Sequence, residues 1–262
     1  MKYTILLVLL CFHATGFAQA DSVANSKNKT EILRLLRAGN LNELNSYFKN
    51  KENEFTFFNE FRDRRVEVTP GYFASVVSFL YEKRLADQST QSYASVKIDV
   101  IAKDSTLIYW KFEYYDCVDT INIHVDSFVN NRELSNIKSA FLKTYKTPLK
   151  TANLFEVYGC FANDLVGEGG IYTDDWKKIM TLIKKKDVRT LRTKLRSGRI
   201  YDQLFAVAGF AELKKKNYPI DKETNEIIKQ IRSKKGSVMV MQGCILHEMK
   251  ISEVVTEMIK WH

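Results

Sequence analysis

The sequence predicts a mixed α and β fold built in two parts. The first part, residues 29–160, is expected to be α+β, with a small antiparallel sheet packed with helices. The second part, residues 174–262, is expected to be an all-α arrangement of helical hairpins. Apolar residues alternate with polar ones between residues 93 and 125, which is typical of antiparallel strands, and the apolar period becomes helical after Gly170.

The distribution of charge supports the same division. The chain carries a net charge of +9, and residues 171–262 account for it with 20 Lys or Arg against 11 Asp or Glu. Residues 21–170 hold 19 basic and 20 acidic residues. The basic excess therefore lies in the last third of the chain, so the two parts are expected to have different surfaces.

The N-terminus has the pattern of a secretory signal peptide over residues 1–20. Lys2 precedes a short apolar run, Ile5–Phe12, and the small residues of Ala18–Ala20 suit a signal peptidase. We expect cleavage after Ala20 and export to the periplasm or the medium. Residues 21–28 are polar and expected to be disordered. Because the apolar run is short and no later segment is longer, no transmembrane segment is expected in the mature chain.

Helices are expected before the strands. Residues 29–50 suggest two short helices separated at Gly39-Asn40, since both residues tolerate the left-handed conformation. Residues 70–84 are predicted as a third helix, with Thr69 as N-cap and Pro70 at the first helical position.

The alternating runs predict three strands, and a helix and a possible fourth strand follow them. The strands are expected over residues 93–102, 106–115 and 118–125, with short turns between them. A helix is expected over residues 132–145, and residues 154–161 suggest a fourth strand.

The C-terminal part is predicted to hold five helices. Their expected ranges are 174–185, 187–198, 201–217, 221–236 and 251–261. Thr173 is the expected cap of the first, and Asp174-Asp175 suit the positive end of its dipole. Residues 237–247 fit a strand, a buried loop or a helix, and the sequence leaves their conformation open.

The glycine-rich run between the two parts is expected to be a junction over residues 161–173. A phosphate-binding loop would place a Lys after its glycines, whereas this run carries Glu168 and is followed by Asp174-Asp175. The spacing of a calcium-binding loop is also absent.

Two segments of the C-terminal part resemble helical repeats of the HEAT type. The run "KKDVRTLRTKL" resembles the start of the second helix of such a repeat, and "RIYDQLFAVAGFAELKK" has its small residues, Ala206, Ala208, Gly209 and Ala211. The resemblance covers residues 175–235 and implies a stack of helical hairpins with a binding surface.

Basic runs end three of the predicted helices, and they are the candidate binding residues. Cations at helix C-termini stabilise the negative end of the dipole. Helix ends on one edge of a stack would also form a cationic rim that attracts an anionic polymer or an acidic envelope protein. The candidates are Lys184, Lys185, Lys186, Lys214, Lys215, Lys216, Lys234 and Lys235.

Catalytic residues are not indicated with any specificity. His124 and Asp126 share a strand face and, with Cys160, could form a nucleophile–base–orienter set. No catalytic motif surrounds them, and His247-Glu248 lacks the second His of a zinc protease. The chain is therefore expected to be non-enzymatic, with a hydrolase site between the two parts, around His124, as an alternative.

Cysteine spacing indicates neither a metal nor a redox cofactor. Cys117, Cys160 and Cys244 follow the signal peptide, so at most one disulfide forms, and the pairing is open. A further alternative is a small-ligand pocket in the sheet, lined by aromatic residues. Those residues are Tyr93, Tyr109, Trp110, Tyr114 and Tyr115.

These observations predict an exported binding or scaffold module of the bacterial envelope that uses a basic helical face. The expected partner is an envelope protein or an anionic polymer. Nucleic acid is not expected, because the chain is exported and carries no nucleic-acid motif.

Overall fold

The computed structural model describes residues 28–51, 64–84, 91–116, 122–155, 160–164, 166 and 170–260. The predicted signal peptide, nearly all of the predicted disordered segment, and Cys117 lie outside these residues. Contacts divide the chain into two compact units. Unit 1 comprises residues 1–63 and 77–129, and unit 2 comprises residues 64–76 and 130–262.

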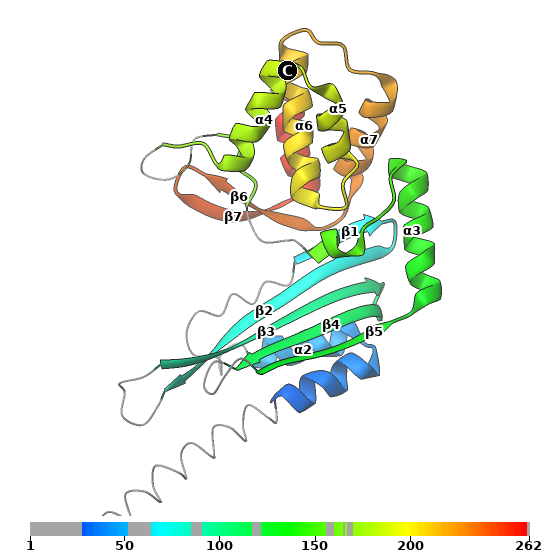
Figure 1. The fold of residues 1–262 in the computed structure, drawn as a ribbon, viewed down its shortest axis with the longest axis vertical. Coiled ribbons are helices and arrows are strands. Elements are labelled where there is room, and N and C mark those ends of the chain that lie inside the picture. The colour runs from blue at the N-terminus through cyan, green and yellow to red at the C-terminus, as the bar shows by residue number, and fades with distance from the viewer. Residues whose placement is uncertain are drawn as a thin grey trace, which may run out of the picture. The chain divides into compact units, whose positions relative to one another are not determined.

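The chain is mixed α and β, as predicted. A helix over residues 28–38 comes first. The elements that follow are α2 (Leu41–Lys51), β1 (Arg64–Thr69), β2 (Tyr72–Arg84), β3 (Gln91–Lys103), β4 (Thr106–Asp116), β5 (Asn122–Val129), α3 (Asn131–Tyr145), the 3-10 helix η1 (Thr151–Phe155), α4 (Asp174–Lys185), α5 (Val188–Leu195), α6 (Ile200–Lys215), α7 (Lys222–Ser233), β6 (Ser237–Gln242), β7 (Ile245–Lys250) and α8 (Ile251–Lys260). Five strands form one sheet in the order β1-β2-β3-β4-β5, and β6 pairs with β7 (Figure 1).

In unit 1 the predicted meander is confirmed. β3 pairs with β4 in antiparallel register, and Val96, Ile98 and Val100 lie opposite Tyr114, Phe112 and Trp110. All six side chains are buried in one cluster with the apolar residues of α2 and of the helix before it. The helices are also pinned by backbone bonds, because Leu41 N–H donates to Ser105 and Leu107 N–H donates to Gly39.

The other face of β3 and β4 carries a ladder of charges. Lys97 lies opposite Glu113, and Asp99 lies opposite Lys111. The Lys97 ammonium is 3.1 Å from Asp99 Oδ1, and the Lys111 ammonium is 2.5 Å from Glu113 Oε1. Asp99 is buried, and this burial raises the pKa of its carboxyl group despite the two lysines.

The predicted helix over residues 70–84 is wrong, because the segment belongs to a β-hairpin. β1 pairs with β2, with Thr69 opposite Tyr72, and Pro70-Gly71 form the turn. Gly71 has φ +81°, the conformation that a type II turn requires after proline. Thr69-Pro70 therefore begins a turn and not a helix. The division between the two units falls inside β2, after Val76.

Unit 2 contains the C-terminal helices. α4 is confirmed over its predicted residues, and Thr173 Oγ1 accepts a hydrogen bond from the Trp176 N–H. α6 lies at the centre of the helices, and it packs on α4, α5 and α8 (Figure 1). A methyl group on Gly209 would lie 2.9 Å from Leu191 Cδ2, so glycine permits the close approach of α6 and α5.

Unit 2 is not all-α, because residues 237–250 form a β-hairpin. Val238 and Val240 on β6 point inward while their neighbours are more exposed, which is the alternation of a half-buried strand. Gly243 has φ +58° at the turn. The sequence left the conformation of residues 237–247 open because their methionines and β-branched residues suit several conformations.

Two further boundaries differ from the sequence prediction. Residues 151–155 form η1, so the predicted strand over 154–161 does not begin where expected. Phe161 nevertheless joins the hairpin, because its N–H donates to Met239 and its carbonyl accepts from Met241. Residues 64–76 and α3 group with unit 2, whereas the sequence assigned them to the first part.

Candidate functional site

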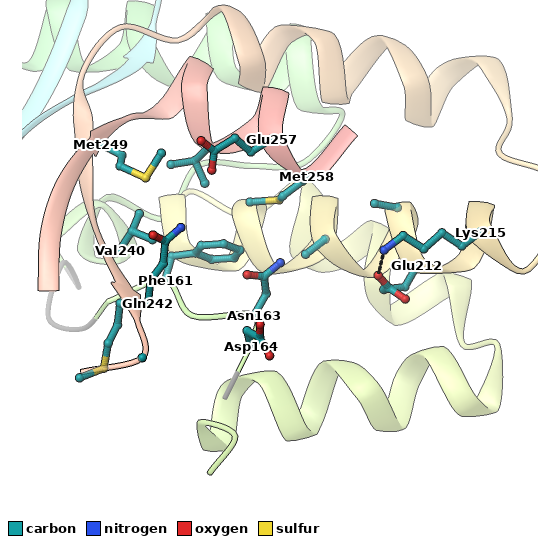
Figure 2. Close-up of a pocket in the computed structure, with 15 residues that line it drawn as sticks. Phe161, Asn163, Asp164, Glu212, Lys215, Val240, Gln242, Met249, Glu257 and Met258 are labelled. Carbon is teal, nitrogen blue, oxygen red and sulfur yellow. Dashed lines mark hydrogen bonds and ion pairs between the residues drawn. The ribbon is translucent and has the colours of Figure 1, made fainter. Parts of the chain in front are cut away.

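A cavity of about 460 Å³ lies in unit 2 between α6, α8 and the β6–β7 hairpin (Figure 2). Its buried apolar walls include Phe161, Val240, Val254 and Met258. The polar lining residues are Asn163, Asp164, Glu212, Lys215, Gln242 and Glu257. This volume lies in the range of small-molecule sites.

The sequence prediction missed this cavity. Its lining comes from four separated segments, and none of them carries a motif. Three methionines, Met241, Met249 and Met258, were the one available signal, because methionine is common at adaptable binding surfaces. The ion pair between Lys215 and Glu212, at 2.5 Å, lies beside the cavity in Figure 2.

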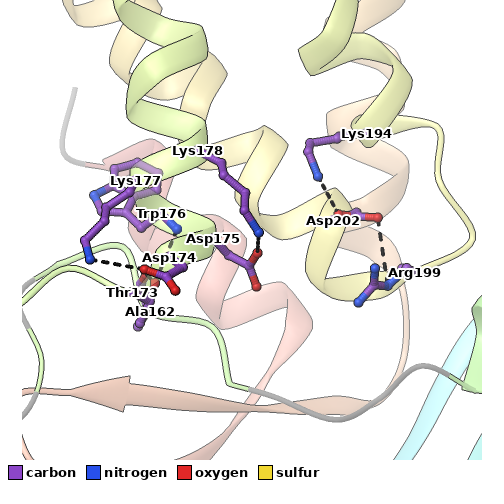
Figure 3. Close-up of polar contacts among 10 residues, drawn as sticks. All are labelled: Ala162, Thr173, Asp174, Asp175, Trp176, Lys177, Lys178, Lys194, Arg199 and Asp202. Carbon is purple, nitrogen blue, oxygen red and sulfur yellow. Dashed lines mark hydrogen bonds and ion pairs between the residues drawn. The ribbon is translucent and has the colours of Figure 1, made fainter.

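Two of the three predicted lysine groups lie at the same end of the helices in unit 2. Figure 3 shows the first turn of α4, at Asp174, and the first turn of α6, at Asp202, at one common end. α4 and α6 therefore run in the same direction, and their C-terminal lysines lie at the opposite end. We call these lysines the basic end: Lys184, Lys185, Lys186, Lys214, Lys215 and Lys216.

The basic end carries largely uncompensated charge. All six side chains are exposed. Lys215 is paired with Glu212, and the side chains of the other five make no hydrogen bond or ion pair within the described residues. Lys186 closes α4 in the left-handed conformation at φ +53°, with its N–H donating to Ile183.

The other end of these helices is neutralised (Figure 3). Lys177 pairs with Asp174 and Lys178 with Asp175, both at 3.1 Å. The Lys194 ammonium lies 2.8 Å from Asp202 Oδ1, and Arg199 Nε lies 3.9 Å from the other oxygen of Asp202. The positive charge of unit 2 is therefore less balanced at the C-terminal ends of α4 and α6.

Lys234 does not belong to an exposed rim, contrary to the sequence prediction. Its side chain is only 8% exposed, and its ammonium lies 5.2 Å from the centroid of the Tyr145 ring. α7 ends in an extended residue at Lys234, so the chain turns inward toward β1. The next residue is fixed by its backbone: Lys235 N–H donates to Glu67 Oε2 at 3.0 Å, and Glu67 N–H donates to the Lys235 carbonyl.

A second cavity, of about 210 Å³, adjoins Lys234. Its lining residues are Glu67, Val68, Thr69, Pro70, Thr144, Tyr145, Gln230, Ser233 and Lys234. Burial lowers the pKa of the Lys234 ammonium to about 7, and the Glu67 carboxylate opposes this shift. Burial also raises the pKa of the Tyr145 hydroxyl.

The structure gives the proposed catalytic residues other partners. His124 is exposed on β5, and the Asp126 carboxylate accepts a hydrogen bond from Arg37 Nη2 at 2.9 Å. That hydrogen bond lowers the pKa of Asp126. Cys160 belongs to unit 2, where its sulfur lies 4.0 Å from the Met241 sulfur.

The remaining candidates also have defined places. Cys244 is exposed at the β6–β7 turn, and His247 is half-buried on β7. Trp110 and Tyr114 are buried in the core of unit 1. Within the described ranges, no group of three or more His, Cys, Asp or Glu side chains is arranged to hold a metal ion. Among the described helices, none has the length and apolar composition needed to cross a bilayer.

Comparisons with known proteins give a similarity but no family. An uncharacterized protein of Methanocaldococcus jannaschii is 29% identical over 190 residues. The match covers 66% of this chain and 65% of that protein, so the chain spans slightly less than two thirds of its relative. No family model matches the sequence, and no solved structure matches the chain.

Proposed function

We propose that the chain is an exported, non-enzymatic binding module whose basic end binds a polyanionic partner of the bacterial envelope. The parallel direction of α4 and α6 is the observation that supports this proposal most directly. Because the two helices run the same way, two lysine triplets that are 30 residues apart in sequence lie at one end of unit 2.

Electrostatics favours a partner with repeated negative charges. Five exposed lysines without ion-pair partners produce a positive potential that extends about 8 Å at physiological salt. Single exposed pairs contribute only about 0.2–1 kcal/mol each. Useful affinity therefore requires several contacts at once, which an acidic polypeptide or an acidic polysaccharide provides.

The helical-repeat architecture is part of this proposal. α5 packs on both α4 and α6, and α7 packs on α5 and α8. Successive helices that pack against each other agree with the proposed HEAT-like hairpins over residues 175–235. In such an arrangement the ends of alternate helices form a binding edge.

The test is a binding titration with fluorescent poly-glutamate, at about 20 mM and about 150 mM salt. The basic-end variant carries K184Q, K185Q, K186Q, K214Q and K216Q, and Lys215 is kept because it pairs with Glu212. At about 0.2–1 kcal/mol for each of the five charges, the affinity of this variant should fall roughly fivefold or more.

The matched control removes five exposed lysines elsewhere in unit 2: K143Q, K177Q, K178Q, K229Q and K250Q. Its net charge equals that of the basic-end variant, and its affinity should change by less than about twofold, because distant charges are screened. Equal losses in the two variants would show that only net charge matters and would reject the proposal.

The cavity in Figure 2 supports a second candidate function, the binding of a small amphipathic molecule. Its methionine and phenylalanine walls suit an apolar body, and Glu257 lies at its edge without an ion pair in the described part of the chain. A positively charged amphiphile such as dodecylamine should bind wild-type protein, and Ala208→Trp should block binding by filling the cavity. Binding that is unchanged in this variant would reject this candidate.

A further inference from the structure

The geometry around Lys234 points to a covalent ligand site that is separate from the basic end. We propose that the cavity beside Lys234 admits a small aldehyde or ketone and that the Lys234 amine captures it as an imine. The cavity, the lysine and the groups that surround it all belong to unit 2.

The first support is the placement of the amine. Lys234 is more than nine-tenths buried, yet its side chain lines the cavity of about 210 Å³. Its amine makes no hydrogen bond or ion pair within the described residues, and its one described close partner is the face of the Tyr145 ring. A buried lysine is usually neutralised by an ion pair, and here a lysine that lines the cavity has none within the described residues.

The second support is a polar group that also lacks a partner. Thr69 is 4% exposed and lines the same cavity. Its hydroxyl makes no hydrogen bond with any residue that the structure describes. A buried hydroxyl of this kind is costly to leave unpaired, and it would donate to the oxygen of a bound carbonyl compound.

The third support is the state of Glu67, the nearest acid. Its two carboxylate oxygens accept the backbone N–H groups of Gly71 at 3.1 Å and Lys235 at 3.0 Å. These bonds hold the carboxylate in place, beyond ion-pair distance from the Lys234 ammonium. The Glu67 charge is therefore available to stabilise the positive charge of a protonated imine.

The protonation state of Lys234 agrees with this chemistry. The charged and titratable groups that face its amine are Glu67 on β1 and Tyr145 on α3. With a pKa of about 7, close to half of the amine is uncharged at neutral pH. An exposed lysine with a pKa of about 10.4 is uncharged in only roughly one molecule in 2,500 at that pH.

The step balances without any oxidant or reductant. The lone pair of the amine forms a bond to the carbonyl carbon, and the carbonyl oxygen gains a proton to give a carbinolamine. Loss of water from the carbinolamine then forms the C=N bond, so amine and carbonyl compound give imine and one water.

The test uses the whole wild-type protein with propanal and sodium cyanoborohydride, which reduces an imine to a stable secondary amine. Peptide mass mapping then measures the labelling rate of every lysine. At pH 7, Lys234 should be labelled at least tenfold faster than Lys184 or Lys214. Its rate should level off above about pH 7.5, whereas theirs should continue to rise.

Two controls test whether fast labelling of Lys234 depends on the cavity or only on the reactivity of its amine. In guanidinium chloride the preference for Lys234 should disappear, because the cavity is lost. An oxidised dextran, whose aldehydes are carried on a polymer that cannot enter a cavity of about 210 Å³, should label Lys184 but not Lys234. Propanal labelling of Lys234 that is no faster than that of exposed lysines, or equal labelling of Lys234 by the oxidised dextran, would overturn the proposal.

Discussion

Lysines lie at the C-terminal ends of α4, α6 and α7, but their environments are opposite. At the basic end, Lys184 and Lys214 are exposed to solvent. At the end of α7, Lys234 is buried against Tyr145, and burial lowers the pKa of its amine. The helix dipole favours a cation at all three helix ends, so the dipole does not explain the difference.

Tertiary packing explains it. After α7 the chain pairs with β1, and Val66 forms an isolated bridge with Gly236. α4 and α6, in contrast, end in local backbone caps. The cap N–H groups of Lys186 and Lys216 donate to carbonyls in the last turn of their own helix. A lysine run at a helix end is therefore exposed only where the chain beyond it stays at the surface.

The largest expected effect comes from breaking the packing that buries Lys234. Gly236→Ala would place a methyl group 2.0 Å from the Arg65 carbonyl oxygen, at a backbone φ of +112°. The backbone must shift, so we expect the free energy of unfolding to fall by roughly 3 kcal/mol or more, as for severe overpacking with strain. Chemical denaturation measures this change.

Gly243→Ala is the matched control for that substitution. Gly243 also has a positive φ, of +58°, but nothing lies within 4 Å of the added methyl group. The expected loss is about 1 kcal/mol, from conformation alone. Equal losses for the two variants would contradict a role of close β1 packing at Gly236.

The next effect is on how the free energy of unfolding changes with pH. The quantity to measure is the difference in this free energy between wild type and Lys234→Met. The pKa of Lys234 is about 7 in the folded state and near 10.5 when unfolded, so the unfolded state binds more protons between these values. The cost of the buried ammonium is fully present below pH 7 and is relieved as pH rises.

Wild type should therefore gain roughly 1–2 kcal/mol of unfolding free energy relative to Lys234→Met between pH 7 and pH 8.5. Below pH 7 the methionine variant should hold its full relative advantage. A difference that stays constant with pH would show that Lys234 is hydrated like the lysines of the basic end.

The smallest effect is expected at the basic end itself. Lys184→Gln, Lys185→Gln and Lys186→Gln together remove cations that stabilise the end of α4 only through the helix dipole. The free energy of unfolding should change by less than about 1 kcal/mol at physiological salt. A larger loss in thermal denaturation would mean that these lysines support the fold.

The sequence predicted the elements whose signals are local. The strand alternation at Val96, Ile98 and Val100 and the Thr173 cap were sufficient, because each depends on neighbours in the chain. The hairpin at Pro70-Gly71 was missed because Thr-Pro also begins helices, and the φ of +81° at Gly71 was needed to decide. The same residues suit both a helix start and a hairpin turn, and the sequence favoured the helix start.

The candidate sites were predicted less well than the fold. The exposed lysines of α4 and α6 were found from composition and helix spacing alone. The burial of Lys234 was not predictable, because it depends on Glu67 and Tyr145, which are distant in sequence. The cavity in Figure 2 draws on similarly separated segments.

The pairing of β1 with the segment after α7 has a consequence for how the protein is made. The bond from Lys235 N–H to the Glu67 side chain joins residues 168 positions apart. At a synthesis rate of about 5–20 residues per second, one edge of β1 has no partner strand for on the order of 10–30 s. An unpaired strand edge can join with another chain during that interval. The newly made protein is therefore expected to depend on a holding chaperone until Lys235 and Gly236 have been synthesised.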